Sequence, residues 1–525
     1  MSSAGSGSSF EGHGTRESAP LVAWRPLVVL VLVKLGLHLV SNGPLSYGYM
    51  SDELYYLDCA NHLAWGYVDH PPLSIALLWA VRAGLGESQL ALRLLPVLAG
   101  CAAVVVVGLM ARELGGGRVA QTLAALATVV SPVYLAVAGF YSMNAFEPLL
   151  WALAAYVLLR LLNGADPRAW LVLGLVIGLG LLNKISMSWL AFGVGVGLLL
   201  TPQRHWLQTP WPWLAAAIAV LLFAPYLVWQ VRHDWPTLEF MRNATRYKMV
   251  PKSPLDFLAA QLLVMNPLLA PLWMAGLAYY FGSRAGRPYR LVAWIWVTTC
   301  VLLMASSSVR SNYLAPAYVV LLPAGAVALA RLASAGTRWL PGAAAVAMTA
   351  GGLAVAPMAI PLLPPPVFAS YQRAIRVSPP RDQVDTLGEL PLHFALRFGW
   401  EDMTQAVAQA YAALPPGERA RAGILAQTFG EAGAIDFFGR ARGLPPAVGT
   451  HNNYWLWGPG SYTGEVMIVL AAPGDAVLSL FEQVERVADV RCDYCMPMLR
   501  QQSVYVCRRM RQPLSELWPS LKTFE

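Results

Sequence analysis

Long apolar runs separated by short polar segments fill the first two thirds of this 525-residue chain. A helix needs about 20 apolar residues to cross a bilayer. The pattern therefore predicts a multi-spanning α-helical membrane protein with about eleven transmembrane helices, near residues 24–41, 89–111, 119–138, 147–162, 169–183, 187–200, 211–230, 257–281, 291–305, 314–330 and 338–362.

The pattern changes after the proline-rich segment 362–367. Short runs typical of strands alternate with helical patterns at 430–443 and 477–487. The runs that we expect to be strands are 422–429, 446–452, 464–472 and 503–510. This alternation predicts a C-terminal α/β domain over residues 367–525, which follows a membrane domain at 24–366.

The polar segment between the first two spans is too rich in charge to lie in lipid. Its apolar residues have helical spacing over 54–65, and a second amphipathic stretch runs from Pro72 to Gly84. We therefore expect interfacial helices at 51–85. Residues 49–73 of this segment carry four acids, namely Asp52, Glu53, Asp58 and Asp69, of which we expect Asp58 to lie on a solvated face.

Composition and charge agree with a membrane protein. Hydrophobic residues make up 57% of the chain and charged residues 13%, whereas a soluble domain has about a quarter charged residues. The net charge of +8 follows from the enrichment of basic residues in cytoplasmic loops, so we expect no nucleic-acid partner.

The same rule predicts the orientation. If the Gly/Ser-rich tail at 1–23 is cytoplasmic and disordered, most basic loops fall inside and the C-terminal domain falls outside. The loops placed inside hold Arg112, Arg118, Arg160, Arg168, Arg204, Arg284, Arg287, Arg290, Arg331 and Arg338. No small-residue cleavage site follows the first span, so we interpret it as an uncleaved transmembrane helix rather than a signal peptide. We expect a bacterial inner-membrane protein with a periplasmic C-terminal domain.

One outer loop breaks the rule, because residues 231–256 carry five cations. They are Arg232, Arg242, Arg246, Lys248 and Lys252. They could bind a lipid phosphate, or they could belong to an amphipathic helix that lies on anionic headgroups. The sequence leaves both interpretations open.

Three of the six cysteines, Cys492, Cys495 and Cys507, cluster in the C-terminal domain. In an oxidising compartment a disulfide among them is favoured over a redox or zinc role, since a single CxxC is weak evidence for zinc. The pairing stays open. Cys59, Cys101 and Cys300 lie in or beside apolar segments and are expected to be packing residues.

Several polar residues beside the apolar spans are candidates for a catalytic or binding role. Group transfer to a hydroxyl or amine needs a base for the acceptor's proton and cations for a departing phosphate. Asp52 and Glu53 supply neighbouring carboxylates, although both could simply cap a helix after Ser51. Glu147 begins a later span on the same face, where Glu-Pro is also a normal helix start. Lys184, deep in an apolar surround, needs a phosphate or a carboxylate as partner.

Two further outer segments contribute candidates. Arg310 and Tyr313 lie in a loop before the tenth span, and Tyr67, Asp69 and His70 precede a Pro-Pro turn. Asp69 and His70 could bind a divalent metal, but so sparse a pair is more often a hydrogen-bonded turn. We do not favour a metal.

The order of these features resembles the superfamily of protein O-mannosyltransferases and lipid A aminoarabinose transferases, which have the GT-C membrane fold. The resemblance covers about residues 25–330 and rests on ordered motifs rather than on one specific motif. The matching motifs are Asp52-Glu53, Tyr67-Val68-Asp69-His70-Pro71, Glu147-Pro148, Lys184 and the segment Arg310 to Pro316.

The resemblance implies an inverting glycosyltransferase with a polyprenyl-phosphate sugar as donor. It implies that Asp52 is the base, that Glu53 and Glu147 support it, and that His70, Lys184 and Arg310 lie near the donor phosphate. No cofactor is then required, because the lipid phosphate is already a stable leaving anion.

The sequence departs from the family pattern at three positions. His70 stands where the aminoarabinose transferases have lysine, and Tyr55 where they have arginine, so Arg246 or Lys248 is expected to complete the phosphate site. Glu147 replaces the Asp that is more usual at its place. The acceptor, which could be a lipid, a glycan or a protein, is left open. The alternatives are a transporter or flippase of a lipid-linked substrate and a non-catalytic assembly partner.

Overall fold

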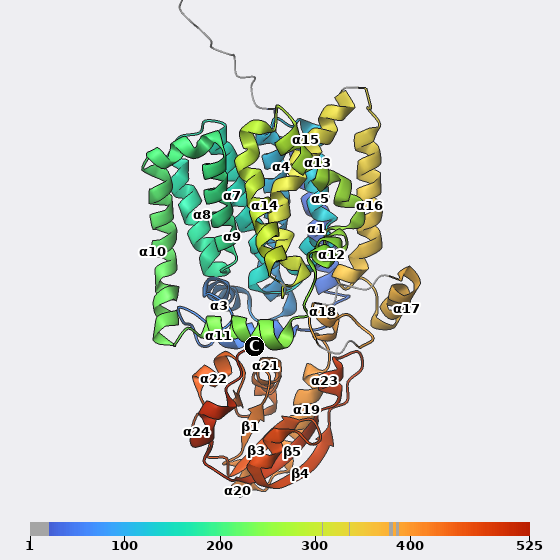
Figure 1. The fold of residues 1–525 in the computed structure, drawn as a ribbon. Helices are drawn as coiled ribbons and strands as arrows, with labels where there is room; N and C mark the ends of the chain where they lie inside the picture. Colours follow the sequence, from blue (N-terminus) through green and yellow to red (C-terminus); the bar gives the residue numbers. More distant parts are fainter. Residues whose placement is uncertain (1–19, 307, 335, 377–381, 385–387) are drawn as a thin grey trace, which may run out of the picture.

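The computed structural model describes residues 20–306, 308–334, 336–376, 382–384 and 388–525. A bundle of long helices forms one part of the molecule and a smaller domain with a sheet covers one end of it (Figure 1). The bundle helices are α1 (Trp24–Asn42), α4 (Gln89–Glu113), α5 (Arg118–Val129), α6 (Pro132–Ala138), α7 (Glu147–Leu162), α8 (Ala169–Asn183), α9 (Met187–Leu200), α10 (Trp211–Arg232), α12 (Pro254–Met265), α13 (Ala270–Gly282), α14 (Arg290–Ala305), α15 (Leu321–Ser334) and α16 (Leu340–Ala359).

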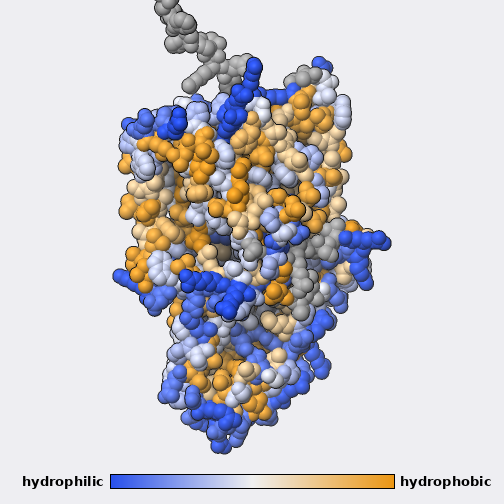
Figure 2. Space-filling model, viewed as in Figure 1, coloured by the Kyte–Doolittle hydropathy of each residue, from blue (hydrophilic) through white to orange (hydrophobic). Residues whose placement is uncertain are grey.

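Within the described residues, seven helices are long and apolar enough to cross a membrane, or up to nine if each bent pair is one span. Each of the eleven expected spans corresponds to a helix or a bent pair. Two of them, α8 and α9, have only 15 and 14 residues. Hydrophobic residues cover much of the side of the bundle, and hydrophilic residues gather at its ends (Figure 2). The predicted membrane fold is confirmed.

Two expected spans are not straight helices. The span predicted at 119–138 consists of α5 and α6, which meet at 61°, and the one at 257–281 consists of α12 and α13, which meet at 98°. A proline follows each break, Pro132 in the first and Pro267 in the second. Proline lacks the backbone N–H that would continue the helix, which explains why the chain bends there.

The basic ends of the helices gather away from the C-terminal domain. Arg112, at the end of α4, donates to the carbonyl of Pro20 at 2.6 Å, and Asn163 joins Glu113 to Tyr289. At its other end α4 carries Arg93, which contacts Asn42 at the end of α1. The loops that we expected inside therefore share one end of the bundle, opposite the C-terminal domain.

Short helices lie between the bundle and the C-terminal domain (Figure 1). They are α2 (Ser51–Cys59), α3 (Leu73–Leu85) and α11 (Pro236–Asn243), and α11 continues into the π-helical turn η3 (Ala244–Lys248). The helix expected over 54–65 ends earlier, at Cys59. Most of the expected tail at 1–23 lies outside the described residues.

The C-terminal domain contains a five-stranded mixed sheet in the order β2-β1-β3-β5-β4. Strands β1 (Gly423–Ala426), β2 (Ala447–Gly449) and β3 (Val466–Ala471) are parallel, and β5 (Ser503–Met510) and β4 (Phe481–Asp489) continue the sheet antiparallel. The domain helices are α17 (Pro365–Ile375), α18 (Leu392–Ala395), α19 (Trp400–Ala413), α20 (Pro416–Arg419), α21 (Phe429–Phe438), α22 (Asn453–Trp457), α23 (Pro497–Arg500) and α24 (Leu514–Leu517).

The helix expected at 477–487 is wrong, because residues 481–489 form strand β4. Leu478, Phe481, Val484 and Val487 recur at the three-residue spacing of a helix face. The segment is instead an edge strand that pairs with β5, for instance Val484 opposite Cys507. Most of its residues are exposed, so burial does not impose the alternating pattern that identifies an inner strand.

The cysteine prediction can be completed. Cys492 and Cys495 form a disulfide, and Cys507 is the buried free thiol that remains in β5. Cys59, Cys101 and Cys300 are buried as well, which agrees with their expected packing role.

Helix α2 is clamped between the two parts of the molecule. It packs on α21 so closely that a Cβ on Gly433 would lie 2.8 Å from the carbonyl carbon of Leu54. One apolar cluster joins Leu54 and Tyr55 of α2 to Ile435 of α21 and Ile468 of the sheet. The C-terminal domain therefore fixes the position of the helix that carries Asp52 and Glu53.

Candidate active site

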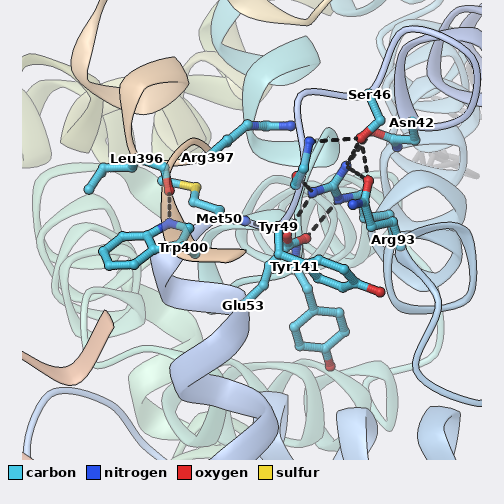
Figure 3. A network of polar contacts seen from close by, with 12 residues as sticks. Asn42, Ser46, Tyr49, Met50, Glu53, Arg93, Tyr141, Leu396, Arg397 and Trp400 are labelled. Atoms are coloured by element: carbon cyan, nitrogen blue, oxygen red, sulfur yellow. Dashed lines mark hydrogen bonds and ion pairs between the residues drawn. The ribbon is translucent and has the colours of Figure 1, made fainter. Parts of the chain in front are cut away.

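Glu53 is fully engaged by neighbouring groups (Figure 3). Arg93 of α4 donates to both of its carboxylate oxygens, at 2.8 and 2.7 Å. The backbone N–H groups of Met50 and Tyr141 donate at 2.9 and 2.8 Å. Burial by itself raises the pKa of Glu53, but the Arg93 charge and these hydrogen bonds bring it below its ordinary value. Glu53 is therefore held as an anion that ties α2 to α4.

Asp52 points to different surroundings. It is partly exposed, and among the described residues no group donates a hydrogen bond to its carboxylate. Removal from water raises the pKa of Asp52 to about 6, the charges of Arg310 and Lys248 oppose this, and Asp69 reinforces it. A carboxylate with a pKa near neutrality and no committed partner can accept a proton.

Asp69, whose charge acts on Asp52, and His70 lie in one turn. The hydroxyl of Tyr55 donates to Asp69 Oδ1 at 2.9 Å, and His70 Nε2 lies 3.8 Å from the same oxygen. Burial lowers the pKa of His70, although Asp69 opposes the shift. A buried neutral histidine carries no positive charge, unlike the lysine that the aminoarabinose transferases have at this position.

Tyr67 stabilises the loop that follows α2, and no hydrogen bond joins it to Asp52 in the described structure. Its hydroxyl lies 3.2 Å from the carbonyl oxygens of Cys59 and His62. Its ring packs 4.8 Å from that of His70. Tyr67 therefore acts on the candidate site through the position of His70.

Glu147 and Lys184 form a second polar group. Lys184 Nζ donates to Glu147 Oε2 at 2.9 Å and to Asn144 at 2.8 Å, and it lies 5.1 Å above the ring of Tyr313. Ser186 donates to the other oxygen of Glu147. Lys184 thus has a carboxylate as its partner, which was one of the two expected alternatives.

The turn before η6 (Ser311–Val320) connects the two groups. Arg310, whose charge acts on Asp52, lies three residues before Tyr313, and its carbonyl accepts a hydrogen bond from the Tyr313 N–H at 3.1 Å. The Arg310 Nε is buried and has no partner among the described residues. This turn carries the Arg310 charge that acts on Asp52 and the Tyr313 ring that lies against Lys184.

The cations of the 231–256 loop have separate places. Lys248 acts on Asp52 through its charge. Arg246 is exposed and lies 5.2 Å from the ring of Tyr247. Lys252 is paired with Asp382 and donates to Ser311 Oγ at 2.9 Å, so it holds the turn beside Arg310. Of the two cations expected at the phosphate site, Lys248 is the one whose charge reaches Asp52.

Sequence reasoning missed several partners. It treated Asp58 as part of a solvated face, whereas Asp58 is only 7% exposed and accepts a hydrogen bond from Tyr454. It also passed over Arg93, although a single cation inside an apolar run signals a buried partner. Asp436, Asn453 and Tyr454 carry no local signal, because only the packing of the C-terminal domain brings them to α2.

The described residues contain no group of three or more His, Cys, Asp and Glu side chains that could hold a metal ion. Asp69 and His70 hydrogen-bond within their own turn and with Tyr55.

Comparison with known proteins supports a glycosyltransferase fold. Residues 69–229 match the family model described as dolichyl-phosphate-mannose-protein mannosyltransferase. The matched range includes Asp69, Glu147 and Lys184. No protein in the curated set matches the chain.

Two solved structures share the fold over nearly the whole chain. The crystal structure of ArnT from Cupriavidus metallidurans bound to undecaprenyl phosphate is 17% identical, with a TM-score of 0.58, and the match covers 91% of this chain and 97% of that one. The cryo-EM structure of the arabinofuranosyltransferase AftD from Mycobacteria is 17% identical with a TM-score of 0.52, and covers 94% of this chain and 40% of that one.

These findings define the class of protein. The chain has the GT-C fold, and the resemblance to the mannosyltransferase and aminoarabinose transferase superfamily is confirmed. It is a multi-pass membrane protein with an additional sheet-containing C-terminal domain.

Proposed function

We propose that this protein is an inverting glycosyltransferase that moves a sugar from a polyprenyl-phosphate donor to an acceptor at the periplasmic face of the bacterial inner membrane. One observation carries the proposal: Asp52 has a raised pKa and no hydrogen-bond donor among the described residues, and it lies in the field of Arg310 and Lys248. A base beside cations is what sugar transfer from a lipid phosphate needs.

The chemistry is a single in-line displacement. The acceptor oxygen or nitrogen forms a bond to the anomeric carbon while the bond from that carbon to the phosphate oxygen breaks. The acceptor proton passes to Asp52. The electron pair leaves with the polyprenyl phosphate, whose negative charge Arg310 and Lys248 stabilise. One displacement inverts the configuration of the anomeric carbon.

Lys184 has a different part in this proposal. Its charge is balanced by Glu147 at 2.9 Å when no donor is present. A donor phosphate offers a second anion to the same ammonium group, so binding would share Lys184 between Glu147 and the phosphate. Glu147 then fixes the position of Lys184 rather than reacting itself.

The direct test uses the purified full chain in lipid nanodiscs, with labelled polyprenyl-phosphate hexoses and pentoses and an envelope extract as acceptor. We expect labelled sugar in the acceptor and release of an equal amount of polyprenyl phosphate. Asp52→Asn should slow both by about 10²- to 10⁴-fold, and the exposed Asp402→Asn is the matched control.

Two outcomes would contradict the proposal. Unchanged transfer by Asp52→Asn would remove the base from the mechanism. Movement of the intact labelled lipid across a sealed membrane, without release of polyprenyl phosphate, would identify the chain as a transporter instead.

A further inference from the structure

A hollow of about 500 Å³ lies at the junction of α2, α21 and α22, away from Asp52. This volume is in the range of small-molecule sites. Its lining combines Asp58 of α2 and His62, which follows α2, with Asp436, Tyr454 and Trp457 of the C-terminal domain. The hollow thus belongs to both parts of the molecule.

One wall of the hollow is aromatic. The ring of Trp457 stacks on His62 with a centroid distance of 4.2 Å and an interplanar angle of 22°, and Tyr454 meets Trp457 edge-on at 4.8 Å. Tyr462 also lines the hollow. Flat rings with polar edges bind ligands that have an apolar face and a hydrogen-bonding rim. A sugar ring has this character.

The lining also contains a carboxyl pair, Asp58 and Asp436, next to Tyr454. The hydroxyl of Tyr454 contacts Asp58 and lies 3.1 Å from Asp436. Because a phenol has one proton, both contacts can be satisfied only if a carboxyl group supplies a second proton. Burial and the nearby Asp58 charge raise the pKa of Asp436 well above its ordinary value. The second proton lies in the contact with Tyr454, and Asn61 and the Ala447 N–H donate to the other two carboxyl oxygens at 2.9 and 2.7 Å. The pair therefore offers a ligand its remaining lone pairs, which accept hydrogen bonds from hydroxyl groups.

The rim adds a single exposed cation. Arg440 lines the hollow and lies 3.8 Å from Glu87 of the bundle domain. Glu87 also pairs with Arg82, so it offsets only part of the Arg440 charge. The lining nevertheless holds an acidic pair rather than a basic cluster. These charges do not favour a phosphate or another strong anion. They favour a neutral, hydroxyl-rich ligand.

The hollow is close to the reaction centre but separate from it. Asp58 lies six residues after Asp52 on α2, a rise of about 9 Å along the helix, and on a different face. Helix α22 touches both places: Asn453 contacts Tyr55, the partner of Asp69, and Trp457 stacks on His62. A ligand in the hollow would be positioned by the same elements that position Asp52.

We propose that this hollow binds a saccharide unit of the acceptor, at a distance from the hydroxyl group that reacts. The assignment rests on the proposed glycosyl transfer and specifies a glycan, or a glycan-bearing lipid, as the acceptor. Trp457 provides the stacking face, and Asp58 and Asp436 bind the sugar hydroxyls.

The test separates binding from transfer. The purified full chain in nanodiscs is applied, without donor, to immobilised oligosaccharides of glucose, mannose, galactose, arabinose and N-acetylglucosamine. We expect binding to at least one of them, and equal binding by Asp52→Asn. Trp457→Ala should weaken it about tenfold or more. Trp457→Phe, which keeps an aromatic face, should retain most of it.

The control is Trp339→Ala, because Trp339 is 69% exposed at the far end of the bundle and should not affect binding. In the transfer assay, Trp457→Ala should raise the KM for the acceptor and leave the KM for the donor unchanged. No binding to any of the oligosaccharides, or binding that Trp457→Ala leaves intact, would overturn the proposal. Binding without transfer would instead contradict the proposed enzyme activity.

Discussion

The carboxylates of Asp52 and Glu53 leave one helical turn in different directions and meet different charges. Glu53 receives four hydrogen bonds, two of them from Arg93. Among the residues that the structure describes, none donates a hydrogen bond to Asp52, and the charges of Arg310 and Lys248 offset its own. Neighbouring residues of the same chemical type thus acquire a structural role and a proposed chemical role through their surroundings.

The raised pKa of Asp52 has a consequence for stability. An ordinary aspartate has a pKa of about 3.9, whereas Asp52 in the folded protein has one of about 6. The folded state therefore prefers the protonated group, and it loses stability as the pH rises through 6.

Asp52→Asn should consequently raise the apparent unfolding temperature at pH 8 and change it little at pH 4. We expect a gain of roughly 1–2 kcal/mol at the higher pH, after allowance for partial exposure of the side chain. Thermal unfolding in nanodiscs at the two pH values measures this. An equal gain at both, or a loss at pH 8, would be inconsistent with a destabilised carboxylate.

Lys184 allows a second prediction for a single residue. Lys184→Met removes the ammonium group and leaves Glu147 with the hydroxyl of Ser186 as a remaining donor. If the donor phosphate shares Lys184, the KM for the polyprenyl-phosphate sugar should rise about tenfold or more, with little change in the KM for the acceptor. A steady-state assay that varies each substrate in turn would show this. A change confined to the acceptor KM would assign Lys184 to the other substrate.

At the scale of the elements, the contact between α2 and α21 decides where Asp52 lies. Gly433 faces the backbone of Leu54 and Tyr55, where an added Cβ would lie 2.8 to 3.0 Å from backbone atoms. Backbone cannot move aside as a flexible side chain can, so a methyl group must push the two helices apart.

Gly433→Ala should therefore lower both the unfolding temperature and the rate of sugar transfer. The matched control is Gly417→Ala, since Gly417 has no atom within 4 Å of an added Cβ. We expect a cost of about 1–3 kcal/mol for the first substitution and little effect of the second. Equal behaviour of the two variants would show that the α2–α21 contact is not tight in solution.

The comparison of expectation with structure is also clearest for elements. Segments with strong local patterns were predictable: the strand expected at 503–510 is β5, and the amphipathic stretch 72–84 is α3. Strand β4 was not, because its state depends on pairing with β5 rather than on its own spacing. The bends at Pro132 and Pro267 have a local cause, because each proline is visible in the sequence. The continuous apolar runs around these prolines nevertheless predict single straight spans.

The residues of the candidate site also divide into those that a local pattern predicts and those that only the packing brings together. The acids of α2, Lys184 and Arg310 could be selected from the sequence because charges beside apolar spans are costly. The contacts of Asn453 with Tyr55 and of Tyr454 with Asp58 join residues almost 400 positions apart. No local pattern contains that information.

In the molecule as a whole, the two ends of the helix bundle differ in what surrounds them. The loops with Arg112, Asn163 and Tyr289 lie together at one end. Helices α3 and α11 and the C-terminal domain lie at the other (Figure 1), where α2 packs on α21. The proposed orientation places the second end in the periplasm, where the disulfide between Cys492 and Cys495 can persist.

Cysteine labelling tests this orientation with little background, because the four free cysteines are all buried. In intact cells with a permeabilised outer membrane, a membrane-impermeant maleimide should label Glu516→Cys in the C-terminal domain. It should not label Arg168→Cys at the opposite end until the inner membrane is lysed. Both native residues are exposed. The reverse pattern would place the C-terminal domain in the cytoplasm.

The pH dependence of sugar transfer shows whether Asp52 is the base. The single-turnover rate of the wild-type protein should rise with pH and level off above about pH 6, as Asp52 loses its proton. Asp52→Asn should be slower by about 10²- to 10⁴-fold and should lack this rise, whereas Asp402→Asn should follow the wild type. A wild-type rate and an unchanged inflection in Asp52→Asn would contradict the role of Asp52 as the base.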